Sequence, residues 1–544
     1  MVKDWLYKKI AEEFHGVDFD ILTPPEPELG DYSTNLVFAL AKRDKQNPAD
    51  VAKEVIGKLS ADRAVSDFFQ KIEFAPPGFI NFFFNERFLR DNLGEIIKRG
   101  DKYGASNLAK GENINLEFVS ANPTGPLTVG NARAASFGDT LGNVFKFAGY
   151  SVTKEYYIND VGVQVRILGE SVAKRFLELK GEKVIFGENL YQGDYVADIA
   201  REIQEKKLAS AIENDFEALV DFCRDYAVAG LIKSAKESAE KLGVKFDNWF
   251  SEKQLHDSGE VKNILSVLEK AGYVYEKDGA KWLKVSEFEK TDDAVLVKSD
   301  GSTSYLMNDI AYTNNKFKRG FDKIINIWGA DHHGDVARLK AGARALGFEK
   351  DKVEILLHQL VLIKKNDELQ RMSKRKGDFM LLDDLLAEVG KDAVRFFFLL
   401  KDLNTHMEFD IDLAKEQSRK NPVFYIQYAT ARLNGVFQKY GGEFEPENFC
   451  QHSDLLTSPD ELRLLSRLVR LPEIIGEVSK NYQVHSLAQY ATDLAHAFHR
   501  FYESSHIIQE DKKLESARLC LARGAQITLK NTLALMGIAA PEKM

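Results

Sequence analysis

The sequence contains few cysteines. Only Cys223, Cys450 and Cys520 occur in 544 residues, far apart and without the Cys-x-x-Cys spacing of zinc ribbons and redox motifs. This scarcity argues against a disulfide framework and against a structural zinc site, and it is typical of proteins from a reducing compartment. We therefore expect a cytoplasmic protein that is not held together by disulfides.

Long apolar runs are also missing. The most apolar segment, 394–400, is short and contains Arg395, whereas a membrane-spanning helix needs about 18 or more apolar residues. The N-terminal segment MVKDWLYKKIAEEFHG is amphipathic and mixed in charge, without the apolar core of a signal peptide. We expect no membrane association.

Positive charge is not in excess. The chain has 74 Lys and Arg against 83 Asp and Glu, which gives a net charge of −9. This excludes a protein coated with basic residues, but it leaves room for a local RNA-binding surface on an acidic body. A hydrophobic fraction of 44% is ordinary for a globular protein, and the length predicts about two to four domains.

Hydrophobic periodicity divides the chain into three parts. Residues 1–85 are expected to form a small α/β domain with helices at 5–14, 34–42 and 49–59 and strands at 71–74 and 79–84. Residues 86–410 are expected to form a catalytic domain, and residues 411–544 a helical domain.

The middle part begins with a strand, a helix and a strand. The strand at 114–118, the helix that ends before Gly149 and the strand at 152–158 form a βαβ unit, which predicts parallel strands. The charge-rich stretch 165–295 is read as a helical insertion between two halves of one sheet. The second half resumes with a strand at 323–328, a helix at 336–346 and an apolar strand at 353–363.

A proline- and glycine-rich loop, SANPTGPLTVGNAR, follows the first of these strands at 120–133. In doubly wound sheets, ligands bind beyond the carboxyl ends of the strands. A glycine at the start of the next helix lets a nucleotide approach the backbone, and the helix N-terminus favours phosphate. Taken alone, the loop is better explained as a plain connection between strand and helix.

A second loop, RMSKRKG at 371–377, lies between the late apolar strand and a helix predicted at 382–388. Its lysines are suited to neutralise the charge that develops as pyrophosphate leaves ATP, in a loop that closes over the nucleotide. The two loops together are a more specific signal than either one.

The pair resembles the HIGH and KMSKS signatures of class I aminoacyl-tRNA synthetases. Over essentially the whole chain, further segments resemble the arginyl-tRNA synthetase family: EFVSANPTGPL, EYYINDVG, IWGADHHG, FDIDLAKEQS, NPVFYIQYA and LKNTLALMGIAAPEKM. The resemblance implies an α/β fold with a Rossmann-like doubly wound parallel sheet, an N-terminal domain that binds the tRNA elbow and an all-α anticodon-binding domain. It also implies an arginine–tRNA ligase that uses ATP with Mg²⁺, without a tightly bound metal, and binds L-arginine and tRNA(Arg). A monomer is expected by default.

Both signatures depart from the family pattern. The first reads Thr128-Val129-Gly130-Asn131, without either histidine, and the second begins with Arg371 instead of lysine. Threonine and asparagine donate hydrogen bonds but carry no positive charge, so we expect Lys374 and Mg²⁺ to stabilise the charge. Asn131 at the helix start is also suited to act as a cap.

The resemblance assigns residues to each ligand. For arginine, Asp309 and Tyr305 hold the guanidinium, Asn122 and His332 hold the α-amino and carboxylate end, and Glu117 contacts the substrate or its neighbours. Without the family, Glu117 reads as an exposed strand residue and Asp309 as a helix cap. Lys374, Ser373, Arg371, Thr128 and Asn131 are the expected catalytic residues. The expected ATP site consists of Pro123, Gly125, Pro126, Leu127, Thr128, Val129, Gly130, Asn131, Gly329, Asp331, Met372, Ser373 and Lys374.

The tRNA contacts are assigned in the same way. Tyr32 and Asn35 are suited to stack on and hydrogen-bond an extruded base, and Gln427, Tyr428 and Arg432 lie on the first helix of the C-terminal domain. Two alternatives stay open: another class I synthetase, of the cysteinyl or methionyl type, and a catalytically inactive paralogue that only binds tRNA. The altered first signature motivates the second.

Overall fold

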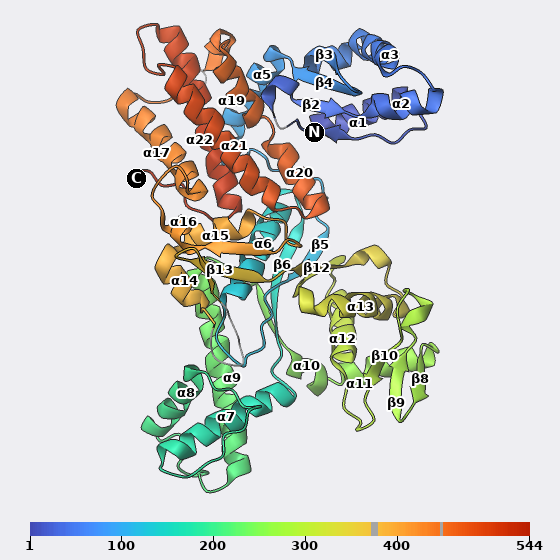
Figure 1. Ribbon diagram of the computed structural model, residues 1–544, viewed down its shortest axis with the longest axis vertical. Coiled ribbons are helices and arrows are strands. Elements are labelled where there is room, and N and C mark those ends of the chain that lie inside the picture. The colour runs from blue at the N-terminus through green and yellow to red at the C-terminus, as the bar shows by residue number, and fades with distance from the viewer. Residues whose placement is uncertain (25, 371–378, 446–449) are drawn as a thin grey trace.

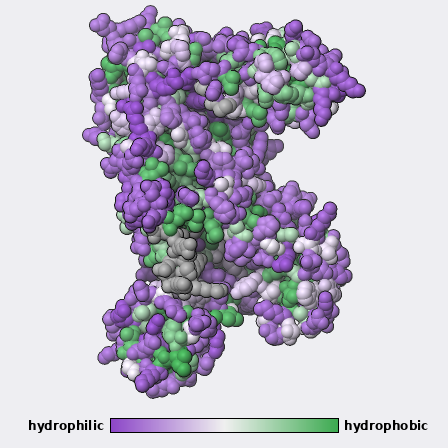
Figure 2. Space-filling model, in the orientation of Figure 1, coloured by the Kyte–Doolittle hydropathy of each residue, from purple (hydrophilic) through white to green (hydrophobic). Residues whose placement is uncertain are grey.

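The computed structural model describes residues 1–24, 26–370, 379–445 and 450–544. Figure 1 shows an upper body made of the N-terminal and helical domains, a central sheet beneath it and two lobes at the lower end. Figure 2 shows the same face covered mainly by hydrophilic residues, with the two lobes standing apart. Within the described part of the chain, no helix is long and apolar enough to cross a membrane.

The N-terminal domain packs helices on an antiparallel sheet with the strand order β1-β2-β4-β3. The predicted strands at 71–74 and 79–84 are present as β3 and β4, which pair with each other. Its elements are α1 (Val2–Glu13), β1 (Ile21–Leu22), β2 (Tyr32–Thr34), α2 (Leu36–Asp44), α3 (Pro48–Ala61), α4 (Arg63–Phe68), β3 (Phe69–Ala75), β4 (Phe79–Phe84) and the following α5 (Glu86–Arg99).

The central sheet is parallel throughout, with the strand order β12-β11-β5-β6-β7. The predicted βαβ unit is confirmed, with α6 as the crossover helix between β5 and β6. The elements are β5 (Asn113–Glu117), α6 (Val129–Phe147), β6 (Ser151–Ile158), β7 (Asn248–Ser251), β11 (Lys323–Gly329), α13 (His333–Ala345) and β12 (Val353–His358). All five strands therefore end at the same edge of the sheet.

The stretch 165–295 is not one continuous helical insertion, because β7 lies within it and forms the edge strand of the sheet. Four residues are too few to show a strand periodicity in the sequence. One lobe precedes β7 and consists of α7 (Val163–Leu179), α8 (Asp194–Glu205) and α9 (Phe216–Lys241). The other follows it and consists of α10 (Glu252–Asp257), α11 (Glu260–Lys270), β8 (Val274–Lys277), β9 (Ala280–Leu283), β10 (Ala294–Val297) and α12 (Tyr305–Lys318).

The prediction of one continuous apolar strand at 353–363 is also wrong. The chain leaves the central sheet after β12, and β13 (Val361–Lys365) pairs instead with β14 (Glu368–Gln370) and β15 (Met407–Asp410). At the break, the fully buried guanidinium of Arg133 donates to the carbonyl oxygens of Gln359 (2.9 Å), Asp402 (2.8 Å) and Thr405 (2.8 Å). A charged donor thus joins three carbonyls that lie outside the sheet ladder.

The C-terminal part is helical, as predicted. Its elements, with those that lead into it, are α14 (Leu382–Val389), α15 (Lys391–Leu399), α16 (Ile411–Lys415), α17 (Pro422–Tyr440), η7 (Cys450–Leu455), α19 (Pro459–Leu468), α20 (Leu471–Asn481), α21 (His485–Ser504) and α22 (Lys512–Leu535). A disulfide joins Cys450 to Cys520, with the Cα atoms 5.4 Å apart. The expectation that the cysteines do not pair is wrong here, because a separation of 70 residues sets no spatial distance.

Helix α6 lies unusually close to the sheet because it presents glycines to it. A Cβ added at Gly138 would stand 2.3 Å from Cγ of Phe118, and one at Gly142 would stand 2.6 Å from Cε of Lys154. Real side-chain atoms cannot approach so closely. The position of α6, and of the loop that leads into it, therefore depends on these glycines.

We predict that Gly138→Ala destabilises the protein by about 1–3 kcal/mol, because the added methyl group forces Phe118 or the helix to move. The matched control is Gly57→Ala in α3, where a Cβ meets nothing within 4 Å. This control should be neutral or should stabilise by about 0.5–1 kcal/mol, since alanine favours a helix more than glycine does. Chemical denaturation of the two variants checks this. Equal stability of both would contradict the close approach.

Candidate active site

The chain turns sharply where β5 ends. Val119 and Ser120 adopt φ values of 71° and 37°, which are costly for residues with a side chain, above all for a β-branched one. The turn is fixed by Ser120, whose hydroxyl donates to Oε1 of Glu117 (2.9 Å) and accepts from the backbone N–H of Tyr157 (3.0 Å). The loop that follows is therefore a rigid extension of the sheet edge.

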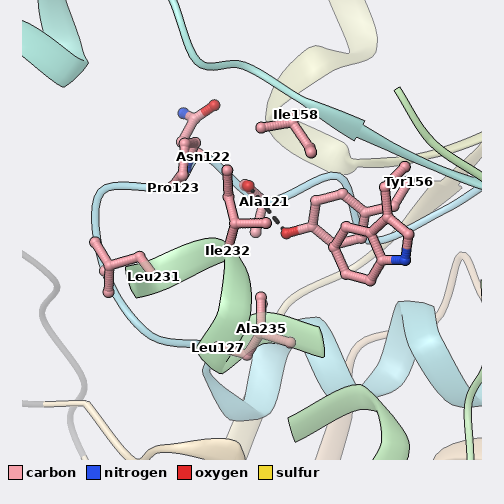
Figure 3. A pocket seen from close by; sticks show the side chains of 11 residues that line it. Ala121, Asn122, Pro123, Leu127, Tyr156, Ile158, Leu231, Ile232 and Ala235 are labelled. Atoms are coloured by element: carbon pink, nitrogen blue, oxygen red, sulfur yellow. Dashed lines mark hydrogen bonds between the residues drawn. The ribbon is translucent and has the colours of Figure 1, made fainter. Parts of the chain in front are cut away.

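The loop then runs between the sheet and the first lobe. The hydroxyl of Tyr156 donates to the carbonyl oxygen of Ala121 (3.0 Å), and that of Tyr195 donates to Thr124 (2.6 Å). A pocket of about 10 Å³ lies behind the loop, with room for about one water molecule. The loop residues that line it in Figure 3 include Asn122, Pro123 and Leu127, and Gly125 lines it too. The side of the loop that lines this pocket packs against α9 and β6.

The start of α6 brings the predicted signature residues together. Oδ1 of Asn131 accepts from the backbone N–H of Thr128 (2.9 Å) and from its hydroxyl (3.0 Å). Thr128 is therefore the N-cap of α6, and Asn131 contributes from the third helical position as its partner in a capping box. The Thr128 hydroxyl and Oδ1 of Asn131 are engaged with each other. The remaining predicted ATP residues here, Pro126, Val129 and Gly130, belong to the same turn. The backbone N–H groups of a helix start favour phosphate without any side chain.

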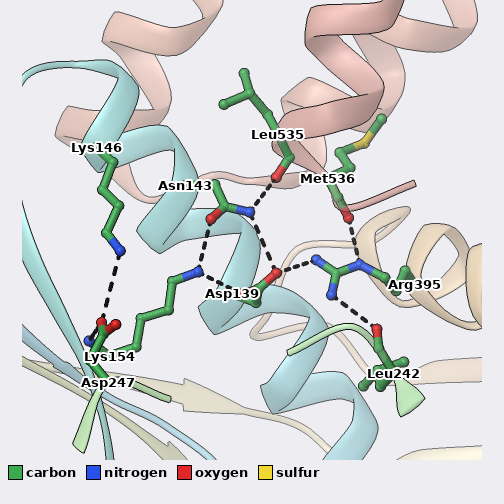
Figure 4. A network of polar contacts seen from close by, with 9 residues as sticks. All are labelled: Asp139, Asn143, Lys146, Lys154, Leu242, Asp247, Arg395, Leu535 and Met536. Atoms are coloured by element: carbon green, nitrogen blue, oxygen red, sulfur yellow. Dashed lines mark hydrogen bonds and ion pairs between the residues drawn. The ribbon is translucent and has the colours of Figure 1, made fainter. Parts of the chain in front are cut away.

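A buried polar network holds α6 against the elements packed around it (Figure 4). Asp139 accepts from Nζ of Lys154 (2.5 Å) and from Nη2 of Arg395 (2.6 Å), and Nε of Arg395 donates to the carbonyl of Met536 (2.6 Å). Burial raises the pKa of Asp139, but the charges of Arg395 and Lys154 outweigh this effect and hold it below its usual value. The network ties α6 to β6, to α15 and to the end of α22.

The other predicted ATP and arginine residues lie where β11 ends. Gly329 ends this strand, and Asp331 and His332 follow it in a short 3-10 helix, η4 (Ala330–His332). Both side chains are exposed, and Nδ1 of His332 lies 3.4 Å from Oδ2 of Asp335. The second signature, with Arg371, Met372, Ser373 and Lys374, lies outside the described residues.

Glu117 is buried, with 5% of its surface exposed, so its alternative reading as an exposed strand residue is wrong. The fully buried ammonium of Lys316 donates to Oε2 of Glu117 (2.6 Å) and to Oδ1 of Asn326 (2.9 Å). The charge of Glu117 is thus already paired within the protein. The ion pair joins the end of β5 to α12.

Tyr305 and Asp309 are one turn apart on α12 and share a face of that helix. The cap of α12 is Ser304, whose hydroxyl accepts from the N–H of Met307 (3.2 Å), so Asp309 is not a cap. The Tyr305 side chain is open to solvent, with 61% of the residue exposed. Burial raises the pKa of Asp309 well above its usual range, and the charges of Glu117 and Glu252 raise it further.

Glu252, at the start of α10, lies close enough for its charge to act on Asp309, and the sequence reasoning missed it. It is 2% exposed, and its Oε1 accepts from Nδ2 of Asn308 (2.5 Å). Burial raises the pKa of Glu252 to about 7. It stands in a charge-rich stretch without a recognised motif. The available signal was a carboxylate two residues after the aromatic pair Trp249-Phe250.

The two residues of the N-terminal domain that are predicted to contact tRNA are buried or half-buried. Tyr32 is 1% exposed, and its hydroxyl donates to Glu473 on α20. It therefore cannot stack on a base in this arrangement, because the ring is buried between the N-terminal and helical domains. Asn35 is half-buried, and its Oδ1 accepts from the N–H of Asp20 (2.8 Å).

The predicted residues of the helical domain lie on α17, as expected. The guanidinium of Arg432 lies over the rings of Tyr428 (4.4 Å) and Tyr502 (4.9 Å), which forms a layered, half-exposed surface. Gln427 instead donates to Asp392 (2.8 Å) and to the carbonyl of Ala539 (3.1 Å), so its amide joins the C-terminal tail to α15. Among the described residues, no group of His, Cys, Asp and Glu is arranged to hold a metal ion.

Three family models match successive parts of the chain. They are the arginyl tRNA synthetase N terminal domain at residues 2–84, the class I (R) tRNA synthetase catalytic domain at 92–412 and the DALR anticodon binding domain at 426–544.

Curated relatives match this chain over nearly its full length. The arginine–tRNA ligase of Thermotoga petrophila is 43% identical over 537 residues, which cover 97% of this chain and 96% of that protein. The enzyme of Carboxydothermus hydrogenoformans is 42% identical over 528 residues, 97% of this chain and 94% of its own. The structure of Thermus thermophilus arginyl-tRNA synthetase covers 100% of this chain and 99% of its own, with a TM-score of 0.79 at 22% identity, and so shares the fold. The chain belongs to the arginyl-tRNA synthetase family of class I aminoacyl-tRNA ligases.

Proposed function

We propose that this arginine–tRNA ligase binds the guanidinium of its substrate between the carboxylates of Asp309 and Glu252, with the ring of Tyr305 at the mouth of the pocket. The observation that carries the proposal is the pair of acidic side chains whose pKa values burial raises. An entering cation favours the ionised form of both. A planar guanidinium with its fork of donors suits two carboxylates better than a point charge does.

Glu117 has a supporting role in this proposal. Lys316 already neutralises it, so it does not need the substrate as a counter-ion. Its other oxygen holds Ser120 and hence the strained turn after β5. Asn122 and His332 lie on the loops that follow β5 and β11, and we assign them to the α-amino and carboxylate end of arginine.

The proposed reaction has two steps. The carboxylate of arginine attacks the α-phosphorus of ATP, bound as its Mg²⁺ complex, and pyrophosphate leaves to give arginyl-adenylate. The terminal ribose hydroxyl of tRNA(Arg) then attacks the activated carbonyl, and AMP leaves. Neither step needs a nucleophile from the protein, so catalysis rests on positioning and electrostatics.

We assign the phosphates of ATP to the backbone of the α6 N-terminus and to Lys374. The side chains of Thr128 and Asn131 serve this site indirectly, because they hold the helix start in shape. For the tRNA, we assign the half-exposed layer of Tyr428 and Arg432 to contact with unpaired bases, since aromatic rings and guanidinium planes both stack on bases.

An inactive paralogue that only binds tRNA is the second candidate, and the cap formed by Thr128 and Asn131 favours it. Arginine-dependent exchange of pyrophosphate into ATP, measured with and without tRNA(Arg), separates the two. We predict exchange that depends on arginine and is absent with cysteine or methionine. Bound tRNA without exchange under either condition would support the paralogue, and exchange with methionine or cysteine would overturn the arginine pocket.

Removal of the negative charge from the pocket gives a direct test. Glu252→Gln should weaken arginine binding by about tenfold or more, since it deletes a charge-assisted contact. In the same variant the melting temperature at pH 8 should hold or rise, because the native protein no longer carries a buried ionised carboxylate. Glu260→Gln on α11, where the carboxylate pairs with Lys318 outside the pocket, is the matched control. Unchanged arginine affinity in Glu252→Gln would refute the assignment.

Arginine binding should also release protons. Burial raises the pKa of Glu252 to about 7 and that of Asp309 well above its usual range, so the empty pocket holds protons that a bound cation displaces. Affinity for arginine should therefore fall as the pH drops below about 7. Calorimetric titrations at one pH in two buffers of different ionisation enthalpy measure the proton count. A binding enthalpy that is the same in both buffers would show that no proton is released.

A further inference from the structure

Glu155 of β6 is a fully buried carboxylate whose two oxygens accept four hydrogen bonds. Oε1 accepts from the hydroxyl of Tyr312 (2.5 Å) and from Nη2 of Arg319 (2.7 Å). Oε2 accepts from Nη1 of Arg319 (2.6 Å) and from Nδ2 of Asn248 (2.6 Å). Burial alone would raise the pKa of Glu155, but the hydrogen bonds from Arg319 and the charge of Lys316 lower it to about 2. The side chain therefore stays ionised at neutral pH.

The donors to Glu155 come from the two elements that position the proposed guanidinium pocket. The hydroxyl and guanidinium donors belong to α12 and its C-cap, and α12 also carries Asp309. The amide donor, Asn248, is the first residue of β7, and Glu252 follows that strand directly at the start of α10. One carboxylate is thus bonded to the elements on both sides of the proposed pocket.

The face of α12 that carries Asp309 also carries the side chains that anchor the helix. They follow at intervals of three or four residues, which places them on one side of a helix: Tyr312, Lys316 and Arg319. Lys316 binds the end of β5, and the other two bind β6. A group carried by a helix is held more precisely than one on a loop, so these anchors set the position of Asp309.

Aromatic rings from the same three elements fill the space between them. Tyr157 of β6 and Phe250 of β7 pack against the ring of Tyr312, with ring centroids 4.4 Å and 4.8 Å away. All three rings are buried. The separation of α12 and β7 therefore depends both on close apolar packing and on the hydrogen bonds to Glu155.

On the basis of the proposed arginine pocket, we propose that Glu155 is a positioning residue for the substrate. Because it holds α12 and β7 at once, it sets the gap between Asp309 and Glu252 without touching arginine. A guanidinium that binds both carboxylates needs both within hydrogen-bond distance, and a displacement of about 1 Å in a site can cost about a hundredfold. Arginine binding thus depends on a charge outside the pocket.

Glu155→Gln tests this role in pyrophosphate exchange with tRNA(Arg) present. In either orientation, the amide puts an NH2 group against donors of α12 or β7, so these elements should shift. The KM for arginine should rise about tenfold to a hundredfold. The KM for ATP, and kcat at saturating arginine, should change less than about threefold, because the loss is one of substrate binding.

The matched control is Glu260→Gln. It also removes a carboxylate that holds α12, but one on α11, which accepts from Asn314 (2.8 Å) and Lys318 (2.7 Å). This control should keep the KM for arginine of the parent protein. A KM for arginine in Glu155→Gln that matches the control would overturn the inference.

A double variant separates positioning from stability. Glu155→Gln leaves the charge of Arg319 without its counter-ion, so the melting temperature should fall. Addition of Arg319→Met removes that charge and should restore most of the melting temperature. The KM for arginine should stay raised, because α12 still lacks its hydrogen bonds to β6. Recovery of the KM together with the melting temperature would show that only stability was lost, and would overturn the inference.

Glu252→Gln distinguishes failure of this inference from failure of the proposed pocket. If Glu252→Gln weakens arginine binding and Glu155→Gln does not, the pocket stands and the positioning role of Glu155 is refuted. Unchanged arginine affinity in Glu252→Gln would refute the proposed pocket itself.

Discussion

The arrangement of the molecule depends on one buried carboxylate, Asp139, held between Lys154 and Arg395. A buried charge is costly unless it is paired, and here each of its partners comes from a different element. The pairing fixes α6 against β6 and α15, while Arg395 also holds the carbonyl at the end of α22. The helix to whose N-terminus we assign the nucleotide is thereby tied to the domain that ends the chain.

The proposed substrate pocket follows the opposite rule. At Asp139, and at Glu117 with Lys316, the protein supplies the counter-ion itself. At Asp309 and Glu252 burial raises the pKa values, so the empty protein tolerates a costly arrangement that a cation relieves. Such local destabilisation is expected at binding sites, where affinity for the ligand offsets stability of the empty protein. In this proposal, the carboxylates that the protein pairs with its own cations have structural roles, and the two whose pKa values burial raises bind the ligand.

Much of the fold could be predicted from the sequence, because hydrophobic periodicity is a local property of the chain. The βαβ unit around α6, the resumption of the sheet at β11 and the helical C-terminal part all follow from residues close together in the chain. Features that depend on distant contacts could not be predicted. They include the edge strand β7, the burial of Tyr32 against Glu473, the Cys450–Cys520 disulfide and the place of Glu252 beside Asp309. The resemblance gave residue roles, but only the contacts show that Glu117 is already paired and that Asn131 is the capping-box partner of Thr128.

The most direct test of the account is a crystal structure with arginine bound. The account predicts the guanidinium between the carboxylates of Asp309 and Glu252, within hydrogen-bond distance of both, with the Glu117–Lys316 pair intact beneath it. A guanidinium that binds Glu117 after displacing Lys316, or one that lies outside the pocket between β5 and α12, would contradict it.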